Sequence, residues 1–116
     1  RALEGFIPSR DAFQVRKLRE AGAIIIGKTN MELFANGFRA LSSLGGQTLS
    51  PYDLSRDPGG SSGGSAVAVT ANFAMAGFGT DSCGSVRFPA VLNEPMLRPG
   101  SIFIGADSPL LLFPIA

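Results

Sequence analysis

The apolar residues of the first third of the chain follow a helical spacing and then form one unbroken run. Over 11–21 they recur every three to four positions, which predicts an amphipathic helix with Ser9 as its N-cap. Gly22 ends this pattern. The run Ala23–Ile26 is short, uniformly apolar and rich in β-branched residues, as expected of a parallel strand buried on both faces.

A short helix is predicted after this strand. Asn30 can cap the mostly apolar residues Met31–Phe34, and the pair Asn36–Gly37 ends them. The first third is therefore predicted to be an α-β-α unit.

The remaining two thirds are less periodic. Small and polar residues dominate 39–60, and a loop of this length in a compact domain is usually functional. The small apolar residues 66–71 predict a buried helix that packs closely on its neighbours, and 73–78 predict a short strand. Residues 109–116 are apolar without a usable period and are too few to span a membrane.

The composition excludes several kinds of chemistry. The 116 residues include no His, which rules out Ser-His-Asp and Cys-His catalysis and histidine-ligated metal. One Cys allows no internal disulfide, so a reducing, cytoplasmic compartment is expected. A net charge of +1 is a poor match for nucleic acid.

The chain contains the residue pattern of a nucleotide-binding motif, but not the structural context that this motif requires. Residues 22–29 match the pattern GxxxxGK[ST]. A P-loop needs a strand before its first Gly, whereas here a helix precedes Gly22 and the residues between the glycines are strand-like. Nucleotide binding at Gly22–Thr29 is kept as a minor alternative.

Two Gly- and Ser-rich segments are stronger candidates for a site. In the first, Ser61 and Ser62 lie among four glycines, which permit a close backbone approach, although such a run can also simply cap a helix. In the second, residues 81–87, several backbone N–H groups can point at one spot, as an oxyanion hole requires, and Ser85 is a candidate nucleophile. An ordinary turn held by an ion pair between Asp81 and Arg87 is the alternative.

The two segments together resemble the amidase signature family. The family's hallmark is a GGSSGG-type run followed by a GTDxxGSxRxPA-type run, which stand here at 59–65 and 79–90. Ser61 and Ser85 are 24 positions apart, in the family's register, and Gly27–Asn30 also looks like the family. The resemblance covers roughly residues 1–90.

The resemblance implies a Ser–cis-Ser–Lys mechanism. Ser85 would be the nucleophile and Ser61 the bridging serine, with a cis peptide between Ser61 and Ser62. Ser62, Asp81 and Arg87 would support the loops. The backbone N–H groups that would form the oxyanion hole are those of Ser82, Cys83, Gly84 and Ser85.

Two departures from the family follow. Neither Lys17 nor Lys28 matches the catalytic lysine of the family, so the chain lacks its general base and is expected to be inactive by itself. Cys83 replaces a Gly or another small residue, and would be strained if the loop required a positive φ there.

The expected fold class is α/β, a fragment of the amidase signature fold with a mixed β-sheet core flanked by helices. Residues 1–90 would be the core fragment and 91–116 a divergent or truncated tail. The expected function is hydrolysis of a small carboxamide through an acyl-serine, with no cofactor, metal, membrane or directly bound nucleic acid. Homo-oligomerisation and a non-catalytic structural or partner-binding role are left open.

Overall fold

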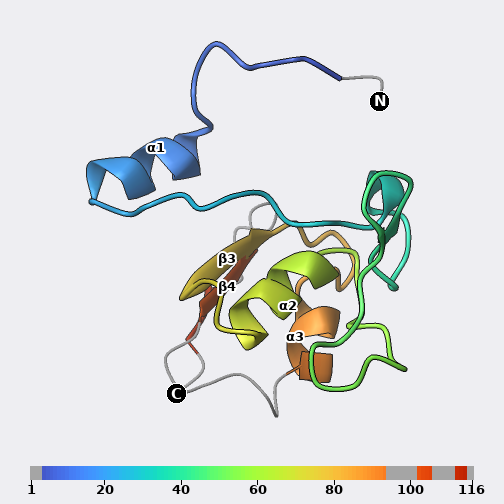
Figure 1. The fold of residues 1–116 in the computed structure, drawn as a ribbon. Helices are drawn as coiled ribbons and strands as arrows, with labels where there is room; N and C mark the ends of the chain where they lie inside the picture. The colour runs from blue at the N-terminus through green and yellow to red at the C-terminus, as the bar shows by residue number, and fades with distance from the viewer. Residues whose placement is uncertain (1–3, 94–101, 106–111, 115–116) are drawn as a thin grey trace.

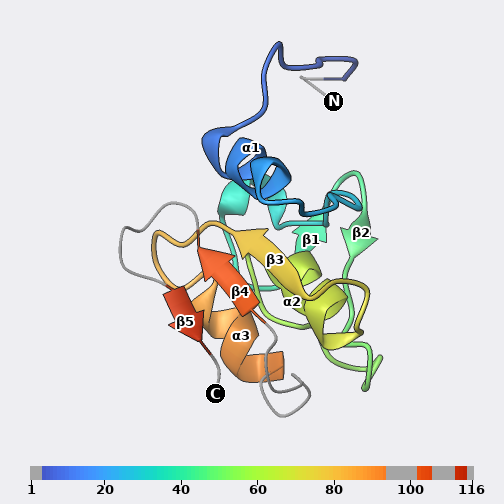
Figure 2. The same ribbon diagram turned by 90° about the vertical axis from the view of Figure 1, so that its left-hand side faces the viewer.

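A three-stranded mixed sheet lies at the centre of the fold. The computed structural model describes residues 4–93, 102–105 and 112–114. The sheet has the order β3-β4-β5, with β3 parallel to β4 and β4 antiparallel to β5 (Figure 2). The three strands are β3 (Ala76–Gly79), β4 (Ile102–Gly105) and β5 (Leu112–Pro114).

Two helices pack beside this sheet and against each other. Helix α2 (Gly63–Thr70) contacts β3, β4 and α3 (Arg87–Asn93) (Figure 1). Ala66 of α2 and Val86 form a small buried cluster, with Ala90 of α3 packed against it. This confirms the predicted buried helix of small residues, which runs from Gly63 to Thr70.

The small residues at the start of α2 permit very close packing. A Cβ added at Gly64 would collide with the carbonyl oxygen of Asn30, and one at Gly63 would lie 2.5 Å from the Cβ of Ala40. Heavy atoms cannot approach so closely, so only glycine fits at these positions. The backbone of α2 is thereby brought directly against two upstream segments.

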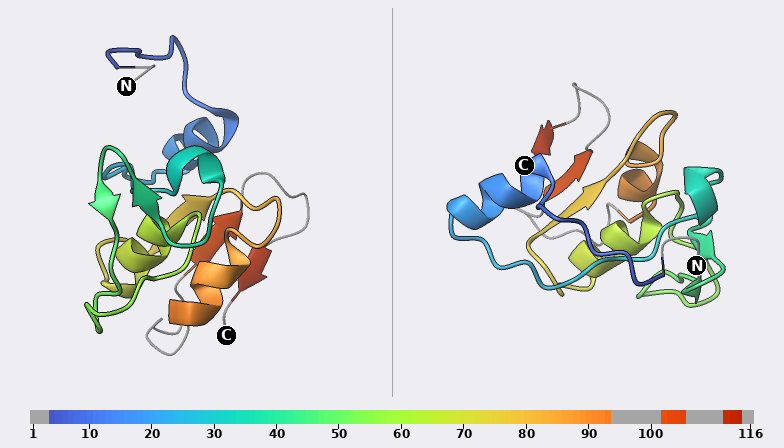
Figure 3. Two further views of the ribbon diagram at one scale, coloured as in Figure 1. Left: turned by 90° about the vertical axis from the view of Figure 1, so that its right-hand side faces the viewer. Right: turned by 90° about the horizontal axis from the view of Figure 1, so that it is seen from above.

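The N-terminal part carries one helix that lies away from the sheet (Figures 1 and 3). None of the residues of this helix is buried. It is followed by a single 3-10 turn and then by a short antiparallel hairpin. These elements are α1 (Phe13–Glu20), η1 (Leu33–Ala35), β1 (Leu41–Ser42) and β2 (Gly46–Gln47).

The helix predicted over 11–21 is confirmed with shorter ends. Its N-cap is Ala12, with no side-chain cap, so the prediction of Ser9 as the cap is wrong. Gly22 ends the helix as expected, with φ at +88°, and the N–H groups of Gly22 and Ala23 donate back to carbonyls of the last turns. A positive φ at this point is a common helix stop.

Two other predictions for the first third are wrong. Residues 23–26 form no strand, and Ile24 is 87% exposed, because no described strand pairs with this run. Asn30 caps no helix: only the 3-10 turn Leu33–Ala35 forms, flanked by Glu32. The Asn30 side chain is instead engaged by the hairpin, described below.

The C-terminal strands differ from the sequence expectation more mildly. The strand predicted over 73–78 is present as β3, shifted toward the C-terminus. Residues 112–114 pair as β5, although their sequence shows no alternating period. The chain is thus a small mixed α/β structure, and within the described residues no helix has the length and apolarity needed to cross a membrane.

Candidate active site

The two Gly- and Ser-rich segments meet in the structure. We call residues 59–64 the serine loop and residues 81–85, which carry the candidate nucleophile Ser85, the nucleophile loop. The serine loop leads into α2 and the nucleophile loop leads into α3, so the packing of these two helices brings the loops together. The backbone N–H of Ser62 donates to the carbonyl oxygen of Ser85 over 3.1 Å.

Ser61 carries a hydroxyl that has no hydrogen-bond partner among the described residues. The residue is fully buried, and within the described part of the chain its Oγ makes no hydrogen bond. Its carbonyl oxygen accepts from the N–H of Glu32 over 2.9 Å. Buried hydroxyls are nearly always hydrogen-bonded, so this one is a candidate for a group that interacts with something beyond these residues.

The cis peptide of the serine loop lies one residue earlier than predicted. It joins Gly60 to Ser61, and the prediction of a cis bond between Ser61 and Ser62 is wrong. Gly60 fits this place because a Cβ on it would come within 2.9 Å of backbone atoms of Phe38, Arg39 and Ala40.

Ser62 occupies the N-cap position of α2 without capping it. Its hydroxyl forms no bond with the first turn of the helix. Instead, the Oγ of Ser62 accepts from the N–H of Thr80 over 3.1 Å and donates to the Thr80 carbonyl over 3.3 Å. The interpretation of this serine as a simple helix cap is therefore not what the geometry shows.

Asp81 holds the nucleophile loop from inside. Its side chain is fully buried and accepts from the N–H groups of Gly84 (2.6 Å), Val86 (3.1 Å) and Arg87 (3.1 Å). The guanidinium of Arg87, which is about half exposed, adds two bonds of 3.1 Å. The ion pair expected between these residues is present, and Asp81 fixes both ends of the turn that carries Ser85.

These contacts hold the pKa of Asp81 well below its usual range. The largest cause is the hydrogen bonding from Arg87, and the N–H groups of Gly84, Arg87 and Val86 act in the same direction, while burial opposes them. The carboxylate reciprocally raises the pKa of Arg87. The loop is thus built around an ionised Asp81.

The lowered pKa predicts acid sensitivity. A carboxyl group whose pKa is lower in the folded state contributes stability that is complete above its unfolded pKa, about 3.9, and is lost as the pH falls below that value. The midpoint of urea unfolding should therefore drop as the pH is lowered from 6 toward 2, and it should drop less for Asp81→Asn. Ser43→Ala, in the exposed turn of the hairpin, is the control and should show the same fall in midpoint as wild type. Equal slopes for wild type and Asp81→Asn would contradict this assignment.

One of the four N–H groups of the predicted oxyanion hole already has an acceptor. The N–H of Gly84 donates to Asp81, whereas those of Ser82, Cys83 and Ser85 make no hydrogen bond within the described residues. Gly84 has the positive φ, +114°, so the strain expected at Cys83 is absent. Cys83 is a free, exposed thiol.

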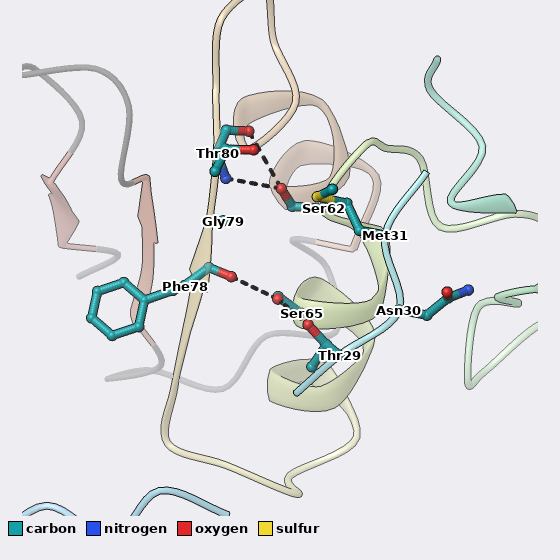
Figure 4. A pocket seen from close by; sticks show the side chains of 8 residues that line it. All are labelled: Thr29, Asn30, Met31, Ser62, Ser65, Phe78, Gly79 and Thr80. Carbon is teal, nitrogen blue, oxygen red and sulfur yellow. Dashed lines mark hydrogen bonds between the residues drawn. The ribbon is translucent and has the colours of Figure 1, made fainter. Parts of the chain in front are cut away.

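A small cavity lies beside the serine loop, on the side of β3 (Figure 4). Its volume is about 160 Å³. The hydroxyls of Thr29 and Ser65 share a hydrogen bond of 2.6 Å at its wall, and Ser65 donates to the carbonyl of Phe78 over 2.7 Å. Neither Ser61 nor Ser85 lines it. The residues that do are Thr29, Asn30, Met31, Ser62, Ser65, Phe78, Gly79 and Thr80.

Asn30 joins the hairpin to α2. Its Nδ2 donates to the carbonyls of Ala40 (3.3 Å) and Gly46 (3.1 Å) and to Thr48 Oγ1 (2.8 Å), and its Oδ1 accepts from Ser42 (2.7 Å). Its carbonyl accepts from Gly64 over 3.1 Å. Sequence reasoning gave Asn30 no role in the site, and the only signal was its place in the stretch 27–30 that looks like the family.

The alternative nucleotide site lacks its key element. A P-loop presents the N-terminus of a helix directly after its Lys-Thr pair. Here no helix begins at Lys28 or Thr29, and the next helical turn is Leu33–Ala35. The hydroxyl of Thr29 is bound to Ser65.

Within the described residues, neither lysine is bonded to Ser61 or Ser85. Lys17 lies on the exposed helix α1 and donates to Glu20 over 2.9 Å. Neither Lys17 nor Lys28 bonds to Ser61, whose hydroxyl is unpaired within the described residues. The geometry thus brings Ser61, Ser62, Asp81 and Ser85 into two touching loops and places Arg87 at the start of α3, directly after the second loop. Both lysines lie outside these loops.

Comparison with known proteins agrees with this arrangement. Residues 1–96 match a family model described as Amidase. The chain therefore belongs to the amidase signature family. It is 41% identical to a protein solved as "Crystal structure of amidase", with a TM-score of 0.62, over 73% of this chain and 22% of that one.

Several curated relatives are named as the A-type subunit of glutamyl-tRNA(Gln) amidotransferase. The chain is 55% identical to the protein of Acidothermus cellulolyticus over 91 residues, which are 78% of this chain and 18% of that protein. It is 56% identical to the protein of Methanococcoides burtonii over 88 residues, 76% of this chain and 18% of that one. The chain thus spans less than a fifth of the length of these relatives.

Proposed function

We propose that this chain supplies the two serines of an amidase active site. Ser85 attacks the carbonyl carbon of a small carboxamide and forms an acyl ester, and the amine or ammonia leaves with a proton. Water then hydrolyses the ester to a carboxylic acid. Ser61 passes the proton between Ser85 and the base.

The observation that carries this proposal is the unpaired hydroxyl of Ser61 within a loop bonded to Ser85. Ser61 Oγ is buried and has no hydrogen-bond partner among the described residues, while the adjacent Ser62 N–H is held by the Ser85 carbonyl at 3.1 Å. A relay serine needs free donor and acceptor capacity near the nucleophile, and a hydroxyl provides both.

The nucleophile loop supports the second requirement, an oxyanion hole. Within the described residues, the N–H groups of Ser82, Cys83 and Ser85 have no acceptor, while that of Gly84 is held by Asp81. We propose that the tetrahedral oxyanion binds to the free N–H groups of this loop. Asp81 and Arg87 act by fixing the nucleophile loop. Ser62 acts by bonding to the backbone of Thr80, the residue that precedes this loop.

The base is the part that this chain does not provide. We propose that a lysine from polypeptide outside these 116 residues contacts Ser61 in the working enzyme, because Lys17 and Lys28 do not. The chain by itself would then have little or no amidase turnover.

The released ammonia has two proposed destinations. In a simple amidase it leaves with solvent. The identity of 50–56% to several proteins named as a subunit of glutamyl-tRNA(Gln) amidotransferase supports a second candidate, in which it is transferred to an acceptor bound by other polypeptides.

Covalent labelling tests the nucleophile directly in the Acidothermus cellulolyticus relative whose 91 matched residues are replaced by those of this chain, so that the host supplies the base. A fluorophosphonate probe should form an adduct at Ser85 of this graft, because it needs an activated hydroxyl and not a complete turnover. Mass spectrometry of peptides should find this adduct in wild type and in Ser43→Ala, which alters an exposed serine of the hairpin turn, and should not find it in Ser85→Ala. Adducts spread over exposed serines, with none at Ser85, would refute the assignment.

A further inference from the structure

Residues 30–32 form two hydrogen bonds with the backbone of the serine loop, one on each side of Ser62. The carbonyl of Asn30 accepts from the N–H of Gly64 over 3.1 Å, and the N–H of Glu32 donates to the carbonyl of Ser61 over 2.9 Å. The first contact fixes the start of α2. The second fixes the backbone of the residue whose hydroxyl is unpaired within the described residues.

The side chain of Glu32 extends these contacts to a second segment. Its Oε2 accepts from the N–H groups of Arg39 and Leu41, both over 3.0 Å. Ala40 between them is fully buried with φ at +57°, a conformation that persists only where its surroundings enforce it. One carboxylate oxygen therefore holds the turn 39–41 in place.

That turn packs directly on the serine loop. A Cβ on Gly60 would lie 2.9 Å from the backbone nitrogens of Arg39 and Ala40, so the two backbones are in contact. The guanidinium Nε of Arg39 lies 3.6 Å from Asp57, whose carboxylate accepts from the N–H of Gly59 over 3.1 Å.

These contacts close a ring around the serine loop. The path runs from the Ser61 carbonyl to Glu32, then to Arg39 and Asp57, and returns to the chain at Gly59. Glu32 contacts the loop through its N–H and the turn through its carboxylate. It is therefore the residue that joins the backbone of Ser61 to the turn 39–41.

We propose that Glu32 is a positioning residue for Ser61. It acts through the backbone and through the turn 39–41, and it does not touch the reacting atoms. This inference rests on the proposed function of Ser61 as the relay to Ser85. Loss of the carboxylate leaves two N–H groups without their acceptor and lets the turn move off Gly60, and a displacement of about 1 Å in a catalytic group can lower a rate by as much as ~10²-fold.

Three variants separate positioning from general stability. In the graft described above, Glu32→Ala should slow the acylation of Ser85 by a fluorophosphonate by about 10- to 100-fold. Glu32→Gln retains a carbonyl oxygen that can accept both N–H groups and should restore the wild-type rate. Asp53→Ala is the matched control, because it removes another half-buried carboxylate that accepts a backbone N–H, that of Ser55, and acylation should stay at the wild-type rate.

A second readout does not depend on chemistry at Ser85. The N–H of Ser62, which bonds to the Ser85 carbonyl, should exchange with deuterium faster in Glu32→Ala than in Asp53→Ala or Glu32→Gln. Acylation and exchange that are unchanged in Glu32→Ala would overturn the inference. So would equal slowing of acylation in Glu32→Ala and Asp53→Ala, because that pattern reports stability alone.

The two proposals fail differently. If wild-type Ser85 takes no label but the Ser62 exchange still responds only to Glu32→Ala, the proposed function is wrong and the hold of Glu32 on the serine loop is supported. If wild-type Ser85 is labelled and Glu32→Ala is labelled as fast, the proposed function is supported and the positioning role is wrong.

Discussion

Ser85→Ala is expected to abolish catalysis, by about 10³-fold or more, in a host enzyme that carries residues of this chain. The host is the Acidothermus cellulolyticus relative, whose 91 matched residues are replaced by those of this chain. Because the chain spans 18% of that protein, the host supplies the rest of the fold. Without the Ser85 hydroxyl no acyl ester can form, whatever base the host provides.

The same graft tests the relay. Ser61→Ala should lower the host's amidotransferase activity by about 10²- to 10⁴-fold, the usual contribution of a positioned proton-transfer group. Ser43→Ala, in the exposed turn of the hairpin, should leave it unchanged. A wild-type graft that folds and is active, with Ser85→Ala equally active, would exclude the proposed nucleophile.

Asp81→Ala is expected to lower the free energy of unfolding by about 3 kcal/mol. The substitution leaves the N–H groups of Gly84, Val86 and Arg87 without their acceptor, and each such group costs about 1–3 kcal/mol if it stays buried. The guanidinium of Arg87 is about half exposed, so water can partly solvate it and limit the loss. Urea unfolding of the chain followed by circular dichroism measures the change.

A second ion pair of the chain provides the comparison. Arg56 lies 2.9 Å from Asp53, with side chains 79% and 39% exposed, and Arg56→Ala should cost much less stability than Asp81→Ala, because exposed ion pairs contribute little. If Asp81→Ala and Arg56→Ala were equally mild, the nucleophile loop would be held by something other than Asp81.

Local sequence patterns predict an element correctly when its own side chains are enough to define it. The small side chains of 63–70 predict close packing wherever that helix lies, and α2 is buried against β3 and α3. The isoleucines at 24–26 also predict burial, but a strand exists only if another strand pairs with it. No described strand does so, and Ile24 is exposed.

In the candidate site, spacing identified the serines but not their supports. Ser61 and Ser85 were indicated by two coupled motifs, and the contact of their loops agrees with that pairing. The local pattern predicts only a short helix for Asn30 and Glu32. It cannot show that their side chains bond to residues 7 to 18 positions away. The cis peptide also lies before Ser61, at Gly60, which packs on the backbone of 38–40, a contact that a local pattern does not show.

Ser62 and Ser65 provide hydrogen-bond partners for the backbone at the end of β3, as a neighbouring strand does in a sheet. Ser62 offers Thr80 both an acceptor and a donor, and Ser65 offers Phe78 a donor, so hydroxyl groups at the start of a helix satisfy backbone groups two residues apart along an extended chain. The end of β3 is thus aligned with α2 as it would be with a paired strand. A shift of β3 by one residue would break all three bonds at once. These bonds therefore fix the position of Thr80, and with it the start of the nucleophile loop.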